Sequence, residues 1–138
     1  MDLRANITHL TPVARGLVGA YVVSGVIHLV KPQVFEGIVP KQLPRRRELV
    51  YVSGVAELAC AAGMLTPRTR EVAGAASAAL LVAVFPANVE MARQAHSRIT
   101  RRGSTPQREV RRALSVARLP LQWPLIRSSV AIARGGRG

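Results

Sequence analysis

The chain has 138 residues, enough for one domain, and carries 20 Lys and Arg against 7 Asp and Glu, a formal net charge of +13. Because 49% of the residues are hydrophobic, the composition excludes a disordered basic tail, and the single cysteine, Cys60, excludes an intrachain disulfide framework. Charged and apolar residues must therefore be segregated along the sequence.

The first apolar segment covers residues 12–30 and contains one charged residue, Arg15. A helix needs about 20 mainly apolar residues to cross a bilayer, so this segment is predicted to be the first transmembrane helix. Residues 31–48 then combine five basic residues with three prolines and with apolar side chains such as Phe35. Because apolar side chains avoid bulk water, we expect an interfacial loop, or a re-entrant one that folds back against the helices.

Two more apolar segments follow. Residues 49–65 contain Glu57 as their only charged residue, and residues 72–92 contain only Glu90. Both are predicted to be transmembrane helices. Residues 66–69 between them include Pro67, which predicts a tight turn.

The last third of the chain is more mixed. Residues 93–112 contain seven arginines with a glycine and a proline, and we expect a mobile, basic cytoplasmic loop that contacts anionic lipids or an acidic partner. Residues 113–133 are apolar but are interrupted by Arg118 and Arg127. They form a fourth transmembrane helix if Arg127 snorkels to the interface and Arg118 lies near an interface or is paired.

These segments predict an all-α fold, a four-helix transmembrane bundle forming a single membrane domain over residues 1–138. The alternative is a soluble bundle, whose helices should alternate polar and apolar faces with a period of 3.6 residues. The first three segments are apolar on every side and would leave such a bundle no hydrated exterior. The pattern therefore favours a membrane-spanning bundle over a soluble one.

The basic residues are unevenly distributed between the predicted connections. Residues 31–48 and 93–112 hold 12 of the 20 Lys and Arg. Since basic loops remain on the cytoplasmic side, we expect both of these loops in the cytoplasm and both termini outside. Nucleic-acid binding is not expected, because the five Phe, Tyr and Trp residues fall mostly within the apolar segments rather than beside the arginines.

Each predicted helix carries at least one polar residue that lipid disfavours. At about 1.5 Å per residue, these residues all fall in the cytoplasmic half of their helices, where they would form one polar layer or a shallow pocket. The candidate binding residues are His28, Glu57, Asn88, Arg118 and Gln122.

Two roles are open for this polar set. In the first, Glu57 and Arg118 clamp the second and fourth helices together, with the amides as hydrogen-bonding glue. In the second, the set is a ligand or proton site, with Glu57 either neutral or ionised against Arg118, His28 or Lys31. One His and one Glu do not make a metal site, and no covalent-cofactor motif is present.

Three prolines lie next to these polar residues, namely Pro86, Pro120 and Pro124. Each removes a backbone donor from its predicted helix. We therefore expect kinks at these positions unless a neighbouring group supplies the missing partner.

Several short motifs, in this order and spacing, resemble the DoxX-like family of small membrane proteins in its short actinobacterial type. They lie between residues 25 and 122: Gly25-Val26-Ile27-His28, Lys31-Pro32, Phe35, Ile38-Val39-Pro40, Leu43-Pro44, Tyr51–Leu58, Thr66–Arg70, Phe85–Val89, Met91-Ala92 and Arg118–Gln122. The resemblance implies a four-helix membrane bundle in a bacterial plasma membrane. It also implies a position near membrane oxidoreductase complexes, some of them quinone-linked, and it supplies no catalytic residue.

Three functions follow from these observations. The first is a non-catalytic accessory subunit of a larger respiratory or oxidoreductase complex. The second is a quinone- or lipid-binding protein, in which a quinone carbonyl accepts a hydrogen bond from His28 or Gln122 and Glu57 supplies a proton. The third is a small homo-oligomeric transporter, ranked last because four short helices make a poor solitary pathway. Catalysis by the chain alone is not expected, because hydrolase, phosphate-loop and dinucleotide motifs are missing.

Overall fold

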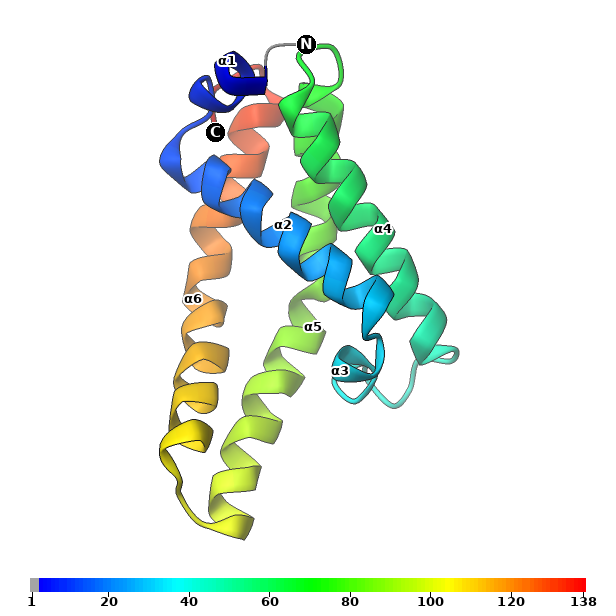
Figure 1. Cartoon of the computed structure of the whole chain (residues 1–138), viewed down its shortest axis with the longest axis vertical. Coiled ribbons are helices and arrows are strands. Elements are labelled where there is room, and N and C mark those ends of the chain that lie inside the picture. Colours follow the sequence, from blue (N-terminus) through cyan, green and yellow to red (C-terminus); the bar gives the residue numbers. More distant parts are fainter. Residues whose placement is uncertain (1–2) are drawn as a thin grey trace.

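The computed structural model describes residues 3–138 and contains only helices, turns and loops within that range. Four long helices dominate, with one short helix before them and another between the first two (Figure 1). The helices are α1 (Leu3–Thr8), α2 (Pro12–Val30), α3 (Gln33–Glu36), α4 (Arg46–Leu65), α5 (Arg70–Arg102) and α6 (Pro106–Ala133).

Three of these helices, α2, α4 and α5, are long and apolar enough to cross a membrane. Their outer surfaces agree with that property, because Val23, Val52, Val72 and Val82 are each at least 60% exposed. Several polar side chains are buried instead, among them His28, Glu57, Ser77, Gln122 and Ser129. An apolar exterior around a partly polar interior is the reverse of a soluble bundle and marks a membrane protein.

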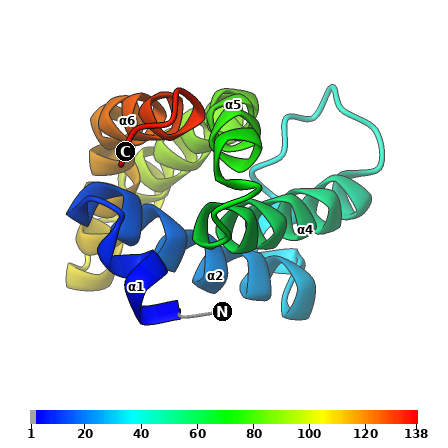
Figure 2. The same ribbon diagram turned by 90° about the horizontal axis from the view of Figure 1, so that it is seen from above.

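The long helices form two antiparallel pairs, α2 with α4 and α5 with α6, and the first pair crosses the second at an angle (Figures 1 and 2). α1 and the C-terminal end of α6 lie at the same end of the molecule. The two basic connections lie toward the other end, where the α5–α6 hairpin projects beyond α3.

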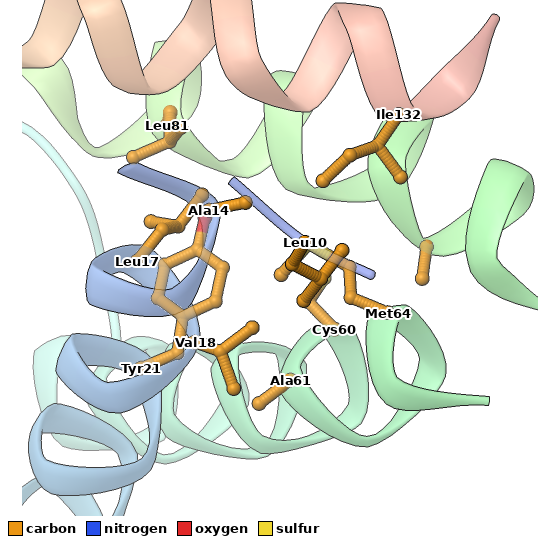
Figure 3. Close-up of a cluster of buried hydrophobic side chains, with 11 residues drawn as sticks. Leu10, Ala14, Leu17, Val18, Tyr21, Cys60, Ala61, Met64, Leu81 and Ile132 are labelled. Carbon is orange, nitrogen blue, oxygen red and sulfur yellow. The ribbon is translucent and has the colours of Figure 1, made fainter. Parts of the chain in front are cut away.

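The hydrophobic core lies at the end of the molecule that carries the termini, where all four long helices meet (Figure 3). Its fully buried side chains include Leu17 from α2, Met64 from α4 and Ile132 from α6. Leu10, which precedes α2, closes this end. His28, Glu57 and Gln122 lie further along the bundle, where they line a cavity.

Two glycines allow α2 and α4 to approach each other closely. A Cβ added at Gly25 would lie 2.9 Å from the carbonyl oxygen of Gly54, and one added at Gly54 would lie 2.6 Å from Cβ of His28. Larger residues would force the backbones apart. The glycine pair therefore sets the distance between the helices that carry His28 and Glu57.

The α5–α6 interface is a seam of small and polar contacts. At its upper end Gly74 packs against the backbone of Ala133, where an added Cβ would lie 2.7 Å from the backbone nitrogen. One turn further along, the hydroxyls of Ser77 and Ser129 are 2.9 Å apart. This pairing fixes the antiparallel register of α6 on α5.

Comparison with the sequence prediction shows where the helix boundaries differ. The first helix has the predicted bounds, the turn at residues 66–69 is present, and α4 begins three residues earlier than predicted. The prediction of a loop over residues 93–112 is wrong, because α5 continues to Arg102 and α6 begins at Pro106.

The reason is that strong helix-ending and helix-starting signals are packed into residues 103–106. Gly103 adopts φ 76°, a conformation that favours glycine, and ends α5. The Thr105 hydroxyl accepts a hydrogen bond from the backbone nitrogen of Arg108, and Pro106 occupies the first turn of α6. Arginine is also a good helix former, so the basic stretch extends both helices.

A polar cavity as the candidate functional site

A cavity of about 290 Å³ lies between the C-terminal half of α2, α3, the N-terminal half of α4 and the middle parts of α5 and α6. Most of its wall is apolar, and it includes Leu17, Leu81, Leu121 and Leu125. The structure brings all five predicted site residues to this wall: His28, Glu57, Asn88, Arg118 and Gln122. The five residues therefore line one cavity, together with Tyr21, Ser24 and Ser53, and their role as a binding site stays a prediction.

His28 and Glu57 face each other across the close α2–α4 crossing. Nδ1 of His28 lies 3.3 Å from Oε2 of Glu57, and each residue is only 8% exposed. The Ser24 hydroxyl donates to Oε1 of Glu57 at 3.2 Å. His28 lies one turn after Ser24 on α2, so the spacing of four residues brings both side chains to Glu57.

The hydrogen bonds determine which nitrogen of His28 carries the proton. Nδ1 lies 2.7 Å from the carbonyl oxygen of Ser24. Since a carbonyl only accepts, Nδ1–H is the donor, and Nε2 of a neutral ring is left as an acceptor. Oε2 of Glu57 is buried and makes no hydrogen bond within the described residues, although it lies close to His28.

The segment after α2 folds over this pair. The ring of Phe35 in α3 stacks on the imidazole of His28, with centroids 3.9 Å apart and planes 5° apart. Ile38 also lines the cavity. Two contacts hold the segment in place: Gln94 of α5 donates to the carbonyl of Gly37 at 2.6 Å, and Arg47 of α4 pairs with Glu36 at 2.6 Å.

The two amides lie on the opposite wall and are hydrogen-bonded to each other. Nδ2 of Asn88 donates to Oε1 of Gln122 at 3.0 Å, and Nε2 of Gln122 donates to the carbonyl of Leu81. Val82 follows Leu81 in α5, and Pro86 removes the backbone donor that its carbonyl would otherwise have. This turn of α5 is therefore open to partners from outside the helix. The bond from Gln122 goes to Leu81 rather than to Val82, so the partner expected for the carbonyl that Pro86 leaves free stays a prediction.

Arg118 does not have its predicted role. It is exposed at the rim of the cavity, and its Nη1 lies 3.6 Å from Sδ of Met91. Within residues 3–138, the Glu57 carboxylate lies 3.3 Å from the His28 ring and forms no ion pair with Arg118. The predicted Glu57–Arg118 clamp, which would have joined α4 to α6, is therefore wrong, and the Glu57–His28 contact joins α2 to α4 instead. The predicted hydrogen bond between the amides is present and joins α5 to α6.

A second polar chain was missed at the sequence level. The Tyr21 hydroxyl lies 2.9 Å from that of Ser77, which lies 2.9 Å from that of Ser129. Ser129 also donates to the carbonyl of Leu125 at 3.0 Å. This chain joins α2, α5 and α6 between the core and the cavity. Serines in apolar helices are common, so only knowledge of the helix rotations could have singled them out.

The cavity wall offers a limited set of chemical groups. The lining side chains of His28, Glu57 and Asn88 carry, in that order, a free acceptor, an unpartnered oxygen and unused amide positions. A molecule with an apolar body and carbonyl or hydroxyl groups would match these groups. Within the described part of the chain, no three His, Cys, Asp or Glu residues are close enough together to hold a metal ion.

Residues 17–133 match the family described as a domain of unknown function, DUF8561. The chain belongs to this family. The DUF8561 region begins in α2 and ends with the last residue of α6, so it contains every residue that lines the cavity. Comparison with curated proteins and with solved structures finds no match.

Proposed function

We propose that the chain is an integral membrane protein with four membrane-spanning helices, whose cavity binds a quinone-class molecule. α6 would be the fourth span because it packs antiparallel to α5 along its length. A helix in that position shares the depth of its partner. The two arginines within its apolar part fit a span, since both Arg118 and Arg127 are exposed and have long side chains that reach toward an interface.

The orientation is part of the same proposal. The C-terminal end of α2, the N-terminal end of α4 and the α5–α6 turn lie toward one end of the molecule (Figure 1). Residues 31–48 and 93–112, which hold most of the basic residues, therefore belong to one side. We place that side in the cytoplasm of a bacterial cell, with the interfacial segment around α3 re-entrant over the cavity.

The observation that carries the proposed ligand is that Glu57 lines a mainly apolar cavity while its buried Oε2 has no hydrogen-bond partner in the described residues. An unpartnered buried carboxylate oxygen is costly, and a ligand hydroxyl would relieve that cost. A quinol offers hydroxyls, and its quinone offers carbonyls for a protonated Glu57. Both have apolar tails that fit an intramembrane site, and about 290 Å³ suits a small headgroup.

A lipid headgroup is less well matched to this site. Arg118 is the only Lys or Arg that lines the cavity, and it lies on the rim rather than deep in the wall. A phosphate inside the cavity would meet Glu57 instead of a cation. The resemblance to DoxX-like proteins supports the quinone as the ligand, and it supports a role as an accessory subunit of a membrane oxidoreductase complex.

The test uses the full chain in phosphatidylcholine nanodiscs with decylubiquinol, kept reduced, as the probe because its hydroxyls can donate to His28 and Glu57, and binding is measured by calorimetry. Glu57→Gln and His28→Ala should each raise the dissociation constant by about tenfold or more, because each removes a hydrogen bond to a buried group. Glu48→Gln is the matched control, since Glu48 is exposed on the same helix and pairs with Arg45. It should bind as the unaltered protein does.

The outcomes separate a binding site from a purely structural contact. If Glu57→Gln and His28→Ala keep their helical content and bind the quinol normally, the pair is only an interhelical contact and the proposal is wrong. The accessory role is tested by mild extraction from native membranes. Recovery of the chain as an unaccompanied oligomer would contradict it.

A further inference from the structure

A second cavity, of about 530 Å³, lies between the C-terminal turns of α5 and the N-terminal turns of α6. Its wall is dominated by arginines, and no Asp or Glu lines it. Three of the arginines come from α5 and two from α6: Arg98, Arg101, Arg102, Arg108 and Arg111.

The arginines of this hairpin divide into two groups. Arg93 pairs with Glu90 at 2.9 Å, and Arg112 pairs with Glu109 at 2.9 Å; neither of these arginines lines the cavity. None of the five that line it takes part in an ion pair within residues 3–138. The uncompensated positive charge is therefore concentrated at the cavity.

The turn holds the two arginine-bearing faces opposite each other. Nη1 of Arg108 donates to the carbonyls of Arg102 and Gly103, at 2.6 and 2.9 Å, and so closes the end of α5. Positions 98, 101 and 102 lie on one face of α5, and positions 108 and 111 lie on one face of α6. Like charges at these spacings repel each other, so the arginines that line the cavity destabilise their own hairpin.

We propose that this cavity binds a ligand that carries two or more phosphate groups. Guanidinium groups match phosphate oxygens in a planar, two-bond geometry, and several of them compensate more than one phosphate. Residue 92 ends the third predicted transmembrane segment. The α5 arginines of the cavity lie about 9–15 Å further along the helix axis, which places the cavity at or past the headgroup layer. Such a ligand has two sources: a lipid headgroup with two phosphates or a soluble polyphosphate.

The experiment measures binding to the full chain in nanodiscs. One arm adds sodium tripolyphosphate to phosphatidylcholine nanodiscs and records calorimetric binding and thermal stability. The other compares nanodiscs with and without cardiolipin. The test variant is Arg101→Gln with Arg111→Gln, one change on each helix. The control is Arg93→Gln with Arg112→Gln, which removes the same charge from the same hairpin outside the cavity.

Saturable binding with a rise in melting temperature, weakened about tenfold or more in the test variant and nearly unchanged in the control, supports the site. If tripolyphosphate gives this result, the ligand is soluble; if only cardiolipin does, it is a lipid. Equal weakening in both double variants would mean that only overall charge matters. That result, or binding that never saturates in either arm, would overturn the proposal.

Discussion

Two glycines and one unpartnered oxygen determine the chemistry of the cavity lined by His28 and Glu57. Gly25 and Gly54 let α2 and α4 approach closely, and this approach brings His28 within 3.3 Å of Glu57. The sequence predicted that these polar residues would share a layer, because depth follows from helix length. It could not predict which residues pair, because the rotation of each helix depends on such glycine contacts.

The first prediction tests the close approach of α2 and α4 with the substitution Gly25→Ala. The new Cβ would lie 2.7 Å from Cγ of Leu58 and 2.9 Å from the Gly54 carbonyl, so the helices must separate. We expect a loss of about 1–3 kcal/mol in unfolding free energy, measured by denaturation in mixed micelles. Gly19→Ala is the control on the same helix, where an added Cβ meets nothing within 4 Å. An equal effect of both changes would contradict the close crossing.

The second prediction compares two adjacent serines. Ser129 is hydrogen-bonded to Ser77 and Leu125, whereas the buried hydroxyl of Ser128 has no hydrogen-bond partner in the described residues. Ser129→Ala should therefore destabilise the fold by about 1–3 kcal/mol, and Ser128→Ala should be neutral or stabilising. Micelle denaturation measures both. If Ser128→Ala were more destabilising than Ser129→Ala, the hydrogen-bond chain through Ser129 would be contradicted.

Among the elements, the α5–α6 hairpin differs most from the sequence prediction. Its basic residues suggested a loop, yet helix-forming arginines and a three-residue turn make one continuous hairpin. The signals at Gly103, Thr105 and Pro106 are readable in the sequence, so this part of the fold was predictable. A loop was nevertheless predicted, because the positive charge of residues 93–112 was given more weight than these three signals. By contrast, the bounds of α2 follow directly from its apolar run and its Thr11 cap.

The hairpin turn also carries a pH-dependent contact, which gives the third prediction. The Ser104 hydroxyl donates to Oε1 of Glu109 at 2.8 Å, and with nearby Arg112 it holds the pKa of Glu109 below its usual range. Because the pKa is lowered in the folded state, the contact stabilises the turn above the usual pKa of the carboxyl group. This stabilisation is lost as the pH falls through the lowered value.

Carbon-13 NMR titration of the glutamate carboxyl groups measures this effect. Ser104→Ala should raise the pKa of Glu109 toward its ordinary value, and Ser97→Ala, on the opposite side of the turn, should leave it unchanged. A pKa of Glu109 that does not respond to the loss of the Ser104 hydroxyl would contradict the contact.

The molecule as a whole combines an apolar exterior with two cavities, one mainly apolar and one lined mostly by arginines. One lies within the apolar helices and is lined by His28 and Glu57, and the other lies in the projecting basic hairpin. The all-helical fold and the apolar helices were predictable from composition and segment length. The second cavity was not, because it requires arginines from two helices to face each other across a turn that the sequence interpretation treated as a mobile loop.

The depth of α6 decides whether the bundle spans the membrane four times. Its two ends can be probed with single cysteines at Gln107 and Arg134 in a Cys60→Ala background, which removes the only native thiol. Labelling with a membrane-impermeant maleimide, in sealed vesicles and again after opening, reports the side on which each residue lies. Our account predicts that Gln107→Cys and Arg134→Cys are labelled from opposite sides. Labelling of both from the same side would contradict it.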